Sequence, residues 1–263
     1  MRILLTSVFG PFGVDDAYGR ASSRMELFHN QVTREQGVFS IRFFHESFGL
    51  HFLAANVEPA TTVLDFPSEA RFVAELRRGY DVVGISFIVA NFLKAKRMAE
   101  LVRRHAPGAK VVLGGHGVQI PEVADQIPHD GRCVGEGVRW LRGFLGEDPA
   151  PPVRHPIRPA TIGGRVLGAR VNDRSGHLTP GLGCPNGCRF CSTSHFFGRQ
   201  YIPYLESGRA MFDQCVAIEE ALGVQRFFVM DENFLQHPER ARELLALMAV
   251  SYTHLTLPTI LLV

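Results

Sequence analysis

Val82–Ile88 reads Val-Val-Gly-Ile-Ser-Phe-Ile and is the stretch that decides the fold. It is an almost unbroken apolar run of strand length, which is typical of strands buried on both faces of a parallel sheet. Similar short runs occur at Arg2–Val8, Thr61–Leu64 and Lys110–Leu113. Cys133–Gly137 reads as a final short strand with its turn, and apolar residues at helical spacing separate the central runs. This alternation predicts an α/β domain with a doubly wound parallel sheet.

Glycine-rich stretches follow three of these strands, at residues 10–13, 114–117 and 135–137. In doubly wound sheets, ligands bind beyond the carboxyl ends of the strands. We therefore expect a cofactor to be contacted by Gly114, Gly115, Gly135 and Glu136. The same glycines could simply make tight turns between strand and helix, and the sequence leaves that alternative open.

The region from Tyr80-Asp-Val-Val-Gly-Ile-Ser to Val-Val-Leu-Gly-Gly-His-Gly, with Gly-Glu-Gly at 135–137, resembles the cobalamin-binding domain that precedes many radical S-adenosylmethionine (SAM) cores. The resemblance implies a Rossmann-like or flavodoxin-like sheet over roughly residues 1–145 that binds cobalamin. The motif Asp-x-His-x-x-Gly, which supplies a histidine to cobalt in one class of cobalamin proteins, is absent. A histidine from that motif is therefore not expected as a lower ligand. A degenerate sheet without a ligand is the alternative.

Proline is frequent between the two halves of the chain, at positions 149, 151, 152, 156 and 159. This composition predicts a stiff, extended linker over residues 147–174. The linker would join a cobalamin-binding-like domain at residues 1–146 to a second domain at residues 175–249.

The strongest functional signal is Gly-Cys-Pro-Asn-Gly-Cys-Arg-Phe-Cys at residues 183–191, which places Cys184, Cys188 and Cys191 in a C-x-x-x-C-x-x-C run. Three thiolates on one bent loop can hold an iron–sulfur cluster and leave it one ligand short of the usual four. The open iron would bind a small molecule, so we predict that these cysteines are metal ligands and part of a catalytic centre. Zinc is the alternative, although structural zinc usually takes four ligands and no second C-x-x-C occurs here.

The run resembles the radical SAM signature Cys-x-x-x-Cys-x-aromatic-Cys, with Phe190 as the aromatic residue. The resemblance implies a [4Fe–4S] cluster whose open iron chelates SAM, reductive cleavage to a 5′-deoxyadenosyl radical, and a position for Phe190 beside the cofactor. It also implies a small-molecule substrate and an electron donor such as flavodoxin or ferredoxin.

The second domain reads as strand, helix, strand, helix. The strands are expected at His177–Thr179 and Arg226–Met230, and the helices bury Met211, Cys215, Ile218 and Leu222 and then Ala241, Leu244, Leu245 and Met248. This order resembles the first two β/α units of the radical SAM partial barrel. Asp231-Glu232-Asn233-Phe234 follows the second strand, and the resemblance implies that Asp231 or Glu232 accepts a hydrogen bond from the SAM ammonium. A solvated loop is the alternative.

The bulk composition is that of an ordinary globular protein, with 46% hydrophobic and 21% charged residues. A formal net charge of +2 gives no electrostatic case for a nucleic-acid partner. No apolar stretch approaches the roughly 20 residues of a membrane span, so no membrane partner is expected. An odd number of cysteines and the lack of a signal-peptide pattern at the start predict a cytoplasmic location.

The end of the chain, Val-Ser-Tyr-Thr-His-Leu-Thr-Leu-Pro-Thr from residue 250, resembles a translated sequencing adaptor. We expect residues 250–263 to be an artefactual tail and the chain to be inactive alone, as the N-terminal fragment of a longer enzyme. A genuine third barrel strand is the alternative, since threonine and isoleucine favour strands.

These patterns together predict a cobalamin-dependent radical SAM enzyme that carries out methyl transfer, a rearrangement or a cyclisation. A radical SAM enzyme that does not use cobalamin is a second possibility. A non-catalytic metal- or cobalamin-binding protein is a third.

Overall fold

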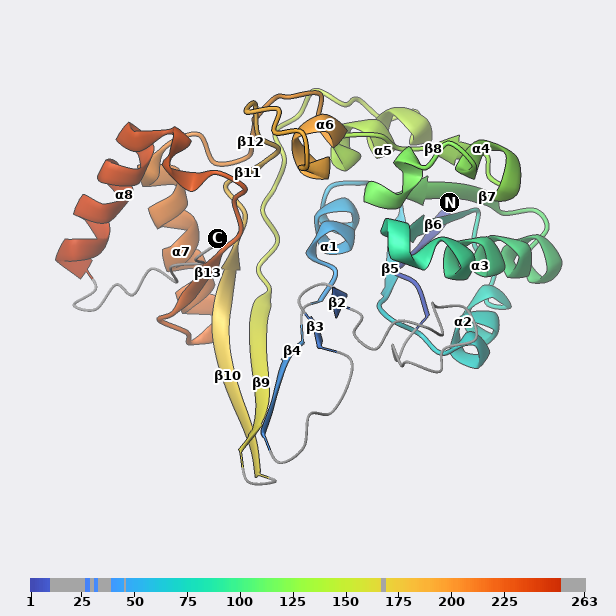
Figure 1. Ribbon diagram of the computed structural model, residues 1–263, viewed down its shortest axis with the longest axis horizontal. Coiled ribbons are helices and arrows are strands. Elements are labelled where there is room, and N and C mark those ends of the chain that lie inside the picture. The colour runs from blue at the N-terminus through green and yellow to red at the C-terminus, as the bar shows by residue number, and fades with distance from the viewer. Residues whose placement is uncertain (10–26, 29–30, 33–38, 45, 167–168, 252–263) are drawn as a thin grey trace. The chain divides into compact units, whose positions relative to one another are not determined.

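A computed structural model describes residues 1–9, 27–28, 31–32, 39–44, 46–166 and 169–251 of the 263-residue chain (Figure 1). The chain divides into two compact units. The first contains Met1–Arg154 and Gly163–Asn172, and the second contains His155–Ile162 and Asp173–Val263.

The first unit is built on a five-stranded sheet. Its strands are β1 (Arg2–Thr6), β5 (Ala60–Leu64), β6 (Val82–Ser86), β7 (Lys110–Gly114) and β8 (Gly131–Arg132). Their order is β5-β1-β6-β7-β8, and every neighbouring pair is parallel. The predicted doubly wound parallel sheet is therefore confirmed, in the order 2-1-3-4-5 that is typical of flavodoxin-like folds.

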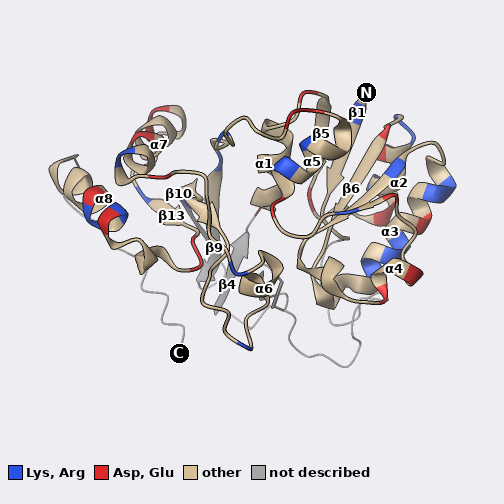
Figure 2. Ribbon diagram, turned by 90° about the horizontal axis from the view of Figure 1, so that it is seen from above, with Lys and Arg blue, Asp and Glu red and all other residues tan. Residues whose placement is uncertain are grey.

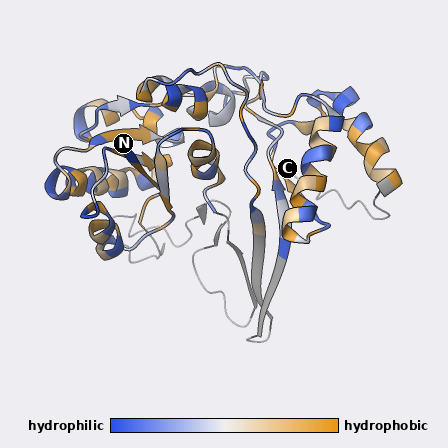
Figure 3. Cartoon of the chain, turned by 180° about the vertical axis from the view of Figure 1, so that it is seen from behind, coloured by the Kyte–Doolittle hydropathy of each residue, from blue (hydrophilic) through white to orange (hydrophobic). Residues whose placement is uncertain are grey.

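Helices pack on this sheet in the described part of the unit. They are α1 (Phe48–Ala55), α2 (Glu69–Leu76), α3 (Phe92–His105), α4 (Val123–Gln126) and α5 (Gly137–Leu145), with 3₁₀ turns η1 (Val89–Asn91) and η2 (His116–Gln119). Basic and acidic residues are interspersed on α2 and α3, where Arg97 and Glu69 form an ion pair at 2.8 Å (Figure 2). Hydrophilic and hydrophobic residues alternate along these helices, as expected for helices with one buried face (Figure 3). No helix in the described ranges combines the length and apolar character that a bilayer crossing requires.

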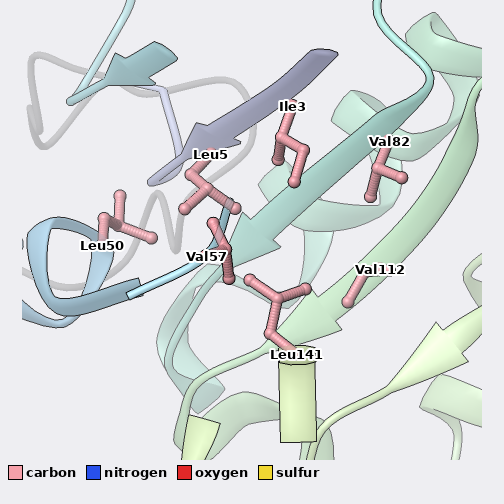
Figure 4. Packing of buried hydrophobic residues seen from close by; sticks show 7 residues of the cluster. All are labelled: Ile3, Leu5, Leu50, Val57, Val82, Val112 and Leu141. Atoms are coloured by element: carbon pink, nitrogen blue, oxygen red, sulfur yellow. The ribbon is translucent and has the colours of Figure 1, made fainter. Parts of the chain in front are cut away.

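The core of the first unit explains why its strands are so apolar. Side chains from β1, β6 and β7 meet side chains of α1, of the loop after α1 and of α5 in a cluster that consists of Ile3, Leu5, Leu50, Val57, Val82, Val112 and Leu141 (Figure 4). Successive residues of a strand point to opposite faces of a sheet. Leu4 lies between Ile3 and Leu5 and is also fully buried, so β1 is covered on both faces.

A buried polar network attaches the segment that follows α5 to the first unit. The Arg142 guanidinium donates to the main-chain oxygens of Asn56 and Pro151 at 2.8 and 2.6 Å. The Asn56 side chain in turn bonds both main-chain groups of Arg154, at 2.7 and 2.8 Å. Residues up to Arg154 are therefore part of this unit, so the boundary between the units lies within residues 147–174, where the sequence predicts a stiff, extended linker.

The second unit follows the predicted order of strand, helix, strand, helix. Two strands, β9 (Pro159–Val166) and β10 (Ala169–Leu178), are divided between the units, since residues 163–172 belong to the first. The elements that lie wholly in the second unit are β11 (Gly181–Leu182), α6 (Ser192–Phe196), β12 (Ile202–Pro203), α7 (Gly208–Leu222), β13 (Phe227–Val229), η3 (Phe234–Gln236) and α8 (Pro238–Ser251). β10 and β13 pair in parallel, with Leu178 opposite Val229. The core that α7 and α8 form with β10 includes Leu178, Met211, Cys215, Ile218, Leu244 and Met248.

Further strands complete the described structure. β2 (Leu27–Phe28) and β3 (Gln31–Val32) form an antiparallel pair, as do β11 and β12. β4 (Phe39–Phe44) is a further strand of the first unit.

Three sequence predictions need correction. The last strand of the first sheet is Gly131–Arg132, two residues before the predicted Cys133–Gly137, which forms the next loop and the start of α5. Strands β9 and β10 replace the second half of the expected linker; Pro159 is tolerated because it is the first residue of its strand. Leu245 is 53% exposed, not inward-facing, because it lies about 100° around the helix from the buried Leu244.

The glycines at 10–13 and the tail at 252–263 lie outside the described residues.

Candidate functional site

The carboxyl ends of β1, β6, β7 and β8 share one edge of the first sheet, called the carboxyl edge from here on. The chain passes from β1 outward to β5 and returns to β6 on the other side of β1. In doubly wound sheets, ligands bind outside the carboxyl ends of the strands where the strand order reverses in this way. The loops after β6 and β7, together with the described residues 7–9 after β1, are therefore the candidate binding site of this unit.

The loops after β6 and β7 are joined to each other by main-chain hydrogen bonds. Phe87 N–H donates to the Gly114 oxygen at 3.1 Å, and Gly117 N–H donates to the Phe87 oxygen at 2.9 Å. Gly115 has a φ of +82°, and a Cβ on it would lie 2.5 Å from the Phe87 oxygen. The fold itself therefore requires a glycine at position 115, which supports the tight-turn alternative for this residue.

Gly114 differs from Gly115 both in its backbone conformation and in the space around it. Its φ is not left-handed, and a Cβ on it would meet no described atom within 4 Å. Neither backbone conformation nor packing within the described chain explains a glycine at the end of β7. No described atom fills the space beside Gly114, which is the kind of approach that a bound ligand needs.

Two buried polar side chains that the sequence reasoning missed lie at the start of α3. Asn91 is 2% exposed, and its side-chain oxygen has no hydrogen-bond partner among the described residues. Lys94 is also buried, and its ammonium donates to the main-chain oxygen of Phe9, after β1, at 3.5 Å. Burial lowers the pKa of Lys94 to about 8. Lys94 thus connects the loops after β1 and β6 where the strand order reverses.

Exposed apolar side chains follow two strands of the carboxyl edge, β6 and β8. Val89 and Leu93, which follow β6, are each 55% exposed, and Val134, which follows β8, is 48% exposed. Single exposed apolar residues are normal on protein surfaces. Their common position after strands of the carboxyl edge suits a ligand with apolar faces.

Gly135 and Glu136 are explained in part by the start of α5. Gly135 has a φ of +89°. The Glu136 carboxylate accepts hydrogen bonds from the N–H groups of Val138 and Arg139 at 2.7 and 2.8 Å, as an N-cap of α5. The role of both residues in cofactor binding remains a prediction.

In the second unit, the three predicted metal ligands lie on one loop between β11 and α6. Ser194 Oγ donates to the Cys184 oxygen at 2.6 Å and accepts from Gly187 N–H at 2.9 Å, so it holds the loop at its bend. Gly187 has a φ of +65°, which a glycine adopts at little cost. Cys184 is buried, Cys191 is partly buried and Cys188 is exposed.

The described geometry does not close a metal site around these thiols. Within the described ranges, no three His, Cys, Asp or Glu side chains form a group that could hold a metal ion. Phe190 is 93% exposed, so it contacts little of the chain itself. Ligation of one metal centre by all three cysteines therefore remains a sequence prediction.

Asp231 is occupied by contacts within the second unit. Its buried carboxylate forms an ion pair with Arg240 at 2.9 Å and accepts hydrogen bonds from the Tyr201 hydroxyl at 3.0 Å and from Asn233 N–H at 2.8 Å. Burial raises the pKa of Tyr201 to about 12, so its hydroxyl stays protonated and able to donate. Arg240 lies nine positions beyond Asp231, and no local sequence signal connects the two.

Glu232 lies beside the cysteine loop. The residue as a whole is exposed, but burial of its carboxyl group raises the pKa of Glu232. The negative charge of Asp231 raises this pKa further, whereas hydrogen bonds from the backbone N–H groups of Glu232 and Gly183 lower it. Gly183 directly precedes Cys184, and the Asn233 side-chain amide lies 4.0 Å from the Cys184 sulfur. Of the two predicted carboxylates, Asp231 is paired with Arg240, and Glu232 lies next to the cysteine loop.

A neutral histidine supports the strand that leads into the cysteine loop. His155 Nδ1 donates to the Pro156 oxygen at 2.9 Å, and its Nε2 accepts from Thr179 N–H at 2.9 Å. Burial lowers the pKa of His155 from 6.5 to about 4, although the bond to Pro156 opposes the shift.

We expect this histidine to make the second unit sensitive to acid. Between pH 6.5 and pH 4, His155 is protonated in the unfolded chain but neutral in the folded one. The free energy of unfolding therefore has its full value above pH 6.5 and decreases as the pH falls, by up to about 3 kcal/mol. His155→Gln keeps an acceptor but cannot titrate. Urea unfolding at pH 7 and pH 5 should show a smaller loss for this variant than for the wild type, and equal losses would contradict the assignment.

Comparisons with known proteins point to the first unit. A protein-family model described as a B12 binding domain matches residues 37–145. The cytidylyl-2-hydroxyethylphosphonate methyltransferase of Streptomyces wedmorensis is 30% identical over 86 residues, which are 33% of this chain and 14% of that protein. The parallel five-stranded sheet fits a Rossmann-like domain of the matched family, and the match supports cobalamin binding. The function of the cysteine run remains a sequence prediction.

Proposed function

We propose that the first unit binds cobalamin at its carboxyl edge and that the protein to which it belongs is an enzyme that uses this cofactor. The family match and the 2-1-3-4-5 strand order support the proposal. The observation that carries it is the match of residues 37–145 to the B12 binding domain, within which Gly114, a glycine with no described atom within 4 Å of an added Cβ, lies at the carboxyl edge.

The residues at the carboxyl edge suit this cofactor. The corrin ring presents wide, largely apolar faces, which exposed Val89, Leu93 and Val134 can contact. Lys94 holds the loops after β1 and β6 together. When bound, cobalamin would supply a methyl group or a cobalt-centred redox step, and the chain's own residues would bind and orient it.

The finer part of the proposal concerns the second unit. We infer from the cysteine run that Cys184, Cys188 and Cys191 bind a [4Fe–4S] cluster that reductively cleaves SAM, with the loop rearranging as the cluster enters. Glu232 is proposed as the acceptor for the SAM ammonium, since Asp231 is already paired with Arg240. Phe190 is proposed to pack on the cofactors after this rearrangement.

Methyl transfer is the reaction class that we propose, ahead of rearrangement or cyclisation. The support is the activity for which the matched relative is named, that of a methyltransferase. A small-molecule substrate, and an electron donor such as flavodoxin or ferredoxin, belong to the same proposal.

Two measurements on the purified chain test these proposals separately. Absorbance titration with hydroxocobalamin should show saturable binding, and no binding would refute the first part. Anaerobic iron–sulfur reconstitution followed by EPR should give a cluster signal that SAM perturbs. Variants with alanine at each of the three cysteines should lose iron. Stoichiometric zinc in place of iron would instead support a non-catalytic metal site.

A further inference from the structure

The side-chain oxygen of Asn91 is a buried acceptor with no visible role in the described chain. Asn91 ends η1 and directly precedes α3, but its side chain makes no capping bond to that helix. Its main-chain N–H is used, donating to the Ile88 oxygen at 2.9 Å. The residue is 2% exposed, so bulk water does not reach the side chain freely.

Such an acceptor is costly to leave without a donor. Buried polar atoms in folded proteins nearly always have a hydrogen-bond partner, and each exception calls for an explanation such as a missing ligand. The structure offers Asn91 no donor within the described residues. A ligand that carries an N–H or O–H group would supply one.

The position of Asn91 is in the loops of the candidate site. η1 packs against η2, the turn that follows β7. The same two loops are joined through Phe87, Gly114 and Gly117 by main-chain bonds. Asn91 and Gly114 therefore belong to two loops that are joined to each other. Asn91 lies in the loop after β6, and Gly114 lies at the start of the loop after β7.

We propose that Asn91 selects the corrinoid by accepting a hydrogen bond from one of its peripheral amide groups. This inference rests on the proposed cobalamin function. Cobalamin and cobinamide carry primary amides around the ring, and an amide N–H donates to a carbonyl oxygen. In cobyrinic acid, ionised carboxylates replace these amides; they can only accept, so the Asn91 oxygen would stay unsatisfied.

The test compares wild type and Asn91→Leu, which replaces the amide with an apolar group of similar size. Removing a buried acceptor that lacks a partner should raise the urea midpoint of the free protein. The same change should weaken cobinamide binding about 10- to 100-fold and leave cobyrinic acid binding unchanged. A purely structural role for Asn91 cannot produce these opposite effects. Gln126→Leu, which removes an exposed amide on α4, is the control and should change neither quantity.

Several results would overturn the inference. A lowered urea midpoint or failure of Asn91→Leu to fold would mean that the oxygen has a partner within the chain. Unchanged cobinamide affinity in the variant, or equal affinities of the wild type for cobinamide and cobyrinic acid, would also refute it. If the wild type binds no corrinoid at all, the proposed function itself fails, and that outcome is distinct from the others.

Discussion

Gly114→Val is expected to weaken hydroxocobalamin binding about 10- to 100-fold while leaving the stability of the free protein unchanged. A valine side chain would occupy the space that we assign to the ligand, and forcing extra atoms into an occupied site costs about 1–3 kcal/mol. The free protein should tolerate the change, because no described atom lies within 4 Å of the added Cβ and φ is ordinary. Valine also favours strands.

The opposite end of the same strand provides the control. Gly108 precedes β7 at its amino end, has an ordinary φ, and a Cβ added there would have no described atom within 4 Å. Gly108→Val should therefore bind hydroxocobalamin as the wild type does. Equal affinities for Gly114→Val and Gly108→Val in an absorbance titration would show that the space at Gly114 does not hold the cofactor.

Arg240→Met is expected to destabilise the second unit by about 3–5 kcal/mol, the usual cost of leaving a buried charge without its partner. The Asp231 and Arg240 side chains are 1% and 4% exposed, so water cannot replace the lost ion pair. Urea unfolding monitored by circular dichroism measures the effect. If Asp231 is the unpaired charge responsible, Asp231→Asn should recover part of the stability in the double variant.

Another arginine on α8 serves as the matched control. Arg242 forms an ion pair with Glu239, but both side chains are well exposed, at 71% and 86%. Exposed pairs at this spacing contribute about 0.5 kcal/mol or less. Similar losses from Arg240→Met and Arg242→Met would contradict the structural role assigned to the buried pair.

Apolar strands were the part of the fold that could be predicted from the sequence. Val82–Ser86 and Lys110–Gly114 are buried on both faces, and such strands have a pattern that needs no tertiary information. The strand Gly131–Arg132 has only two residues and no apolar run, so its position could not be read. Strand β9 contains a proline and two glycines and β10 contains one glycine, so pairing across the sheet determines their structure more than local composition does.

The candidate site was predictable at the level of loops but not of individual roles. The sequence does not distinguish the roles of the adjacent glycines Gly114 and Gly115. Only the backbone conformation shows that the fold requires a glycine at position 115 and not at position 114. Asn91 precedes a helix, where asparagine usually acts as a cap, so its buried and unbonded side chain had no sequence signal. Asp231 and Glu232 could be told apart only through Arg240, a distant partner that the fold brings to Asp231.

The location of the cofactor is tested most directly by hydrogen–deuterium exchange of the chain with and without hydroxocobalamin. We predict slower exchange in peptides that contain Ser86–Asn91 and Gly114–Gln119, the loops after β6 and β7. Peptides at the amino ends of the same strands, around Gly108, should exchange at an unchanged rate. Protection confined to the amino ends, or absent from both loops while cobalamin is bound, would contradict a cobalamin site at the carboxyl edge.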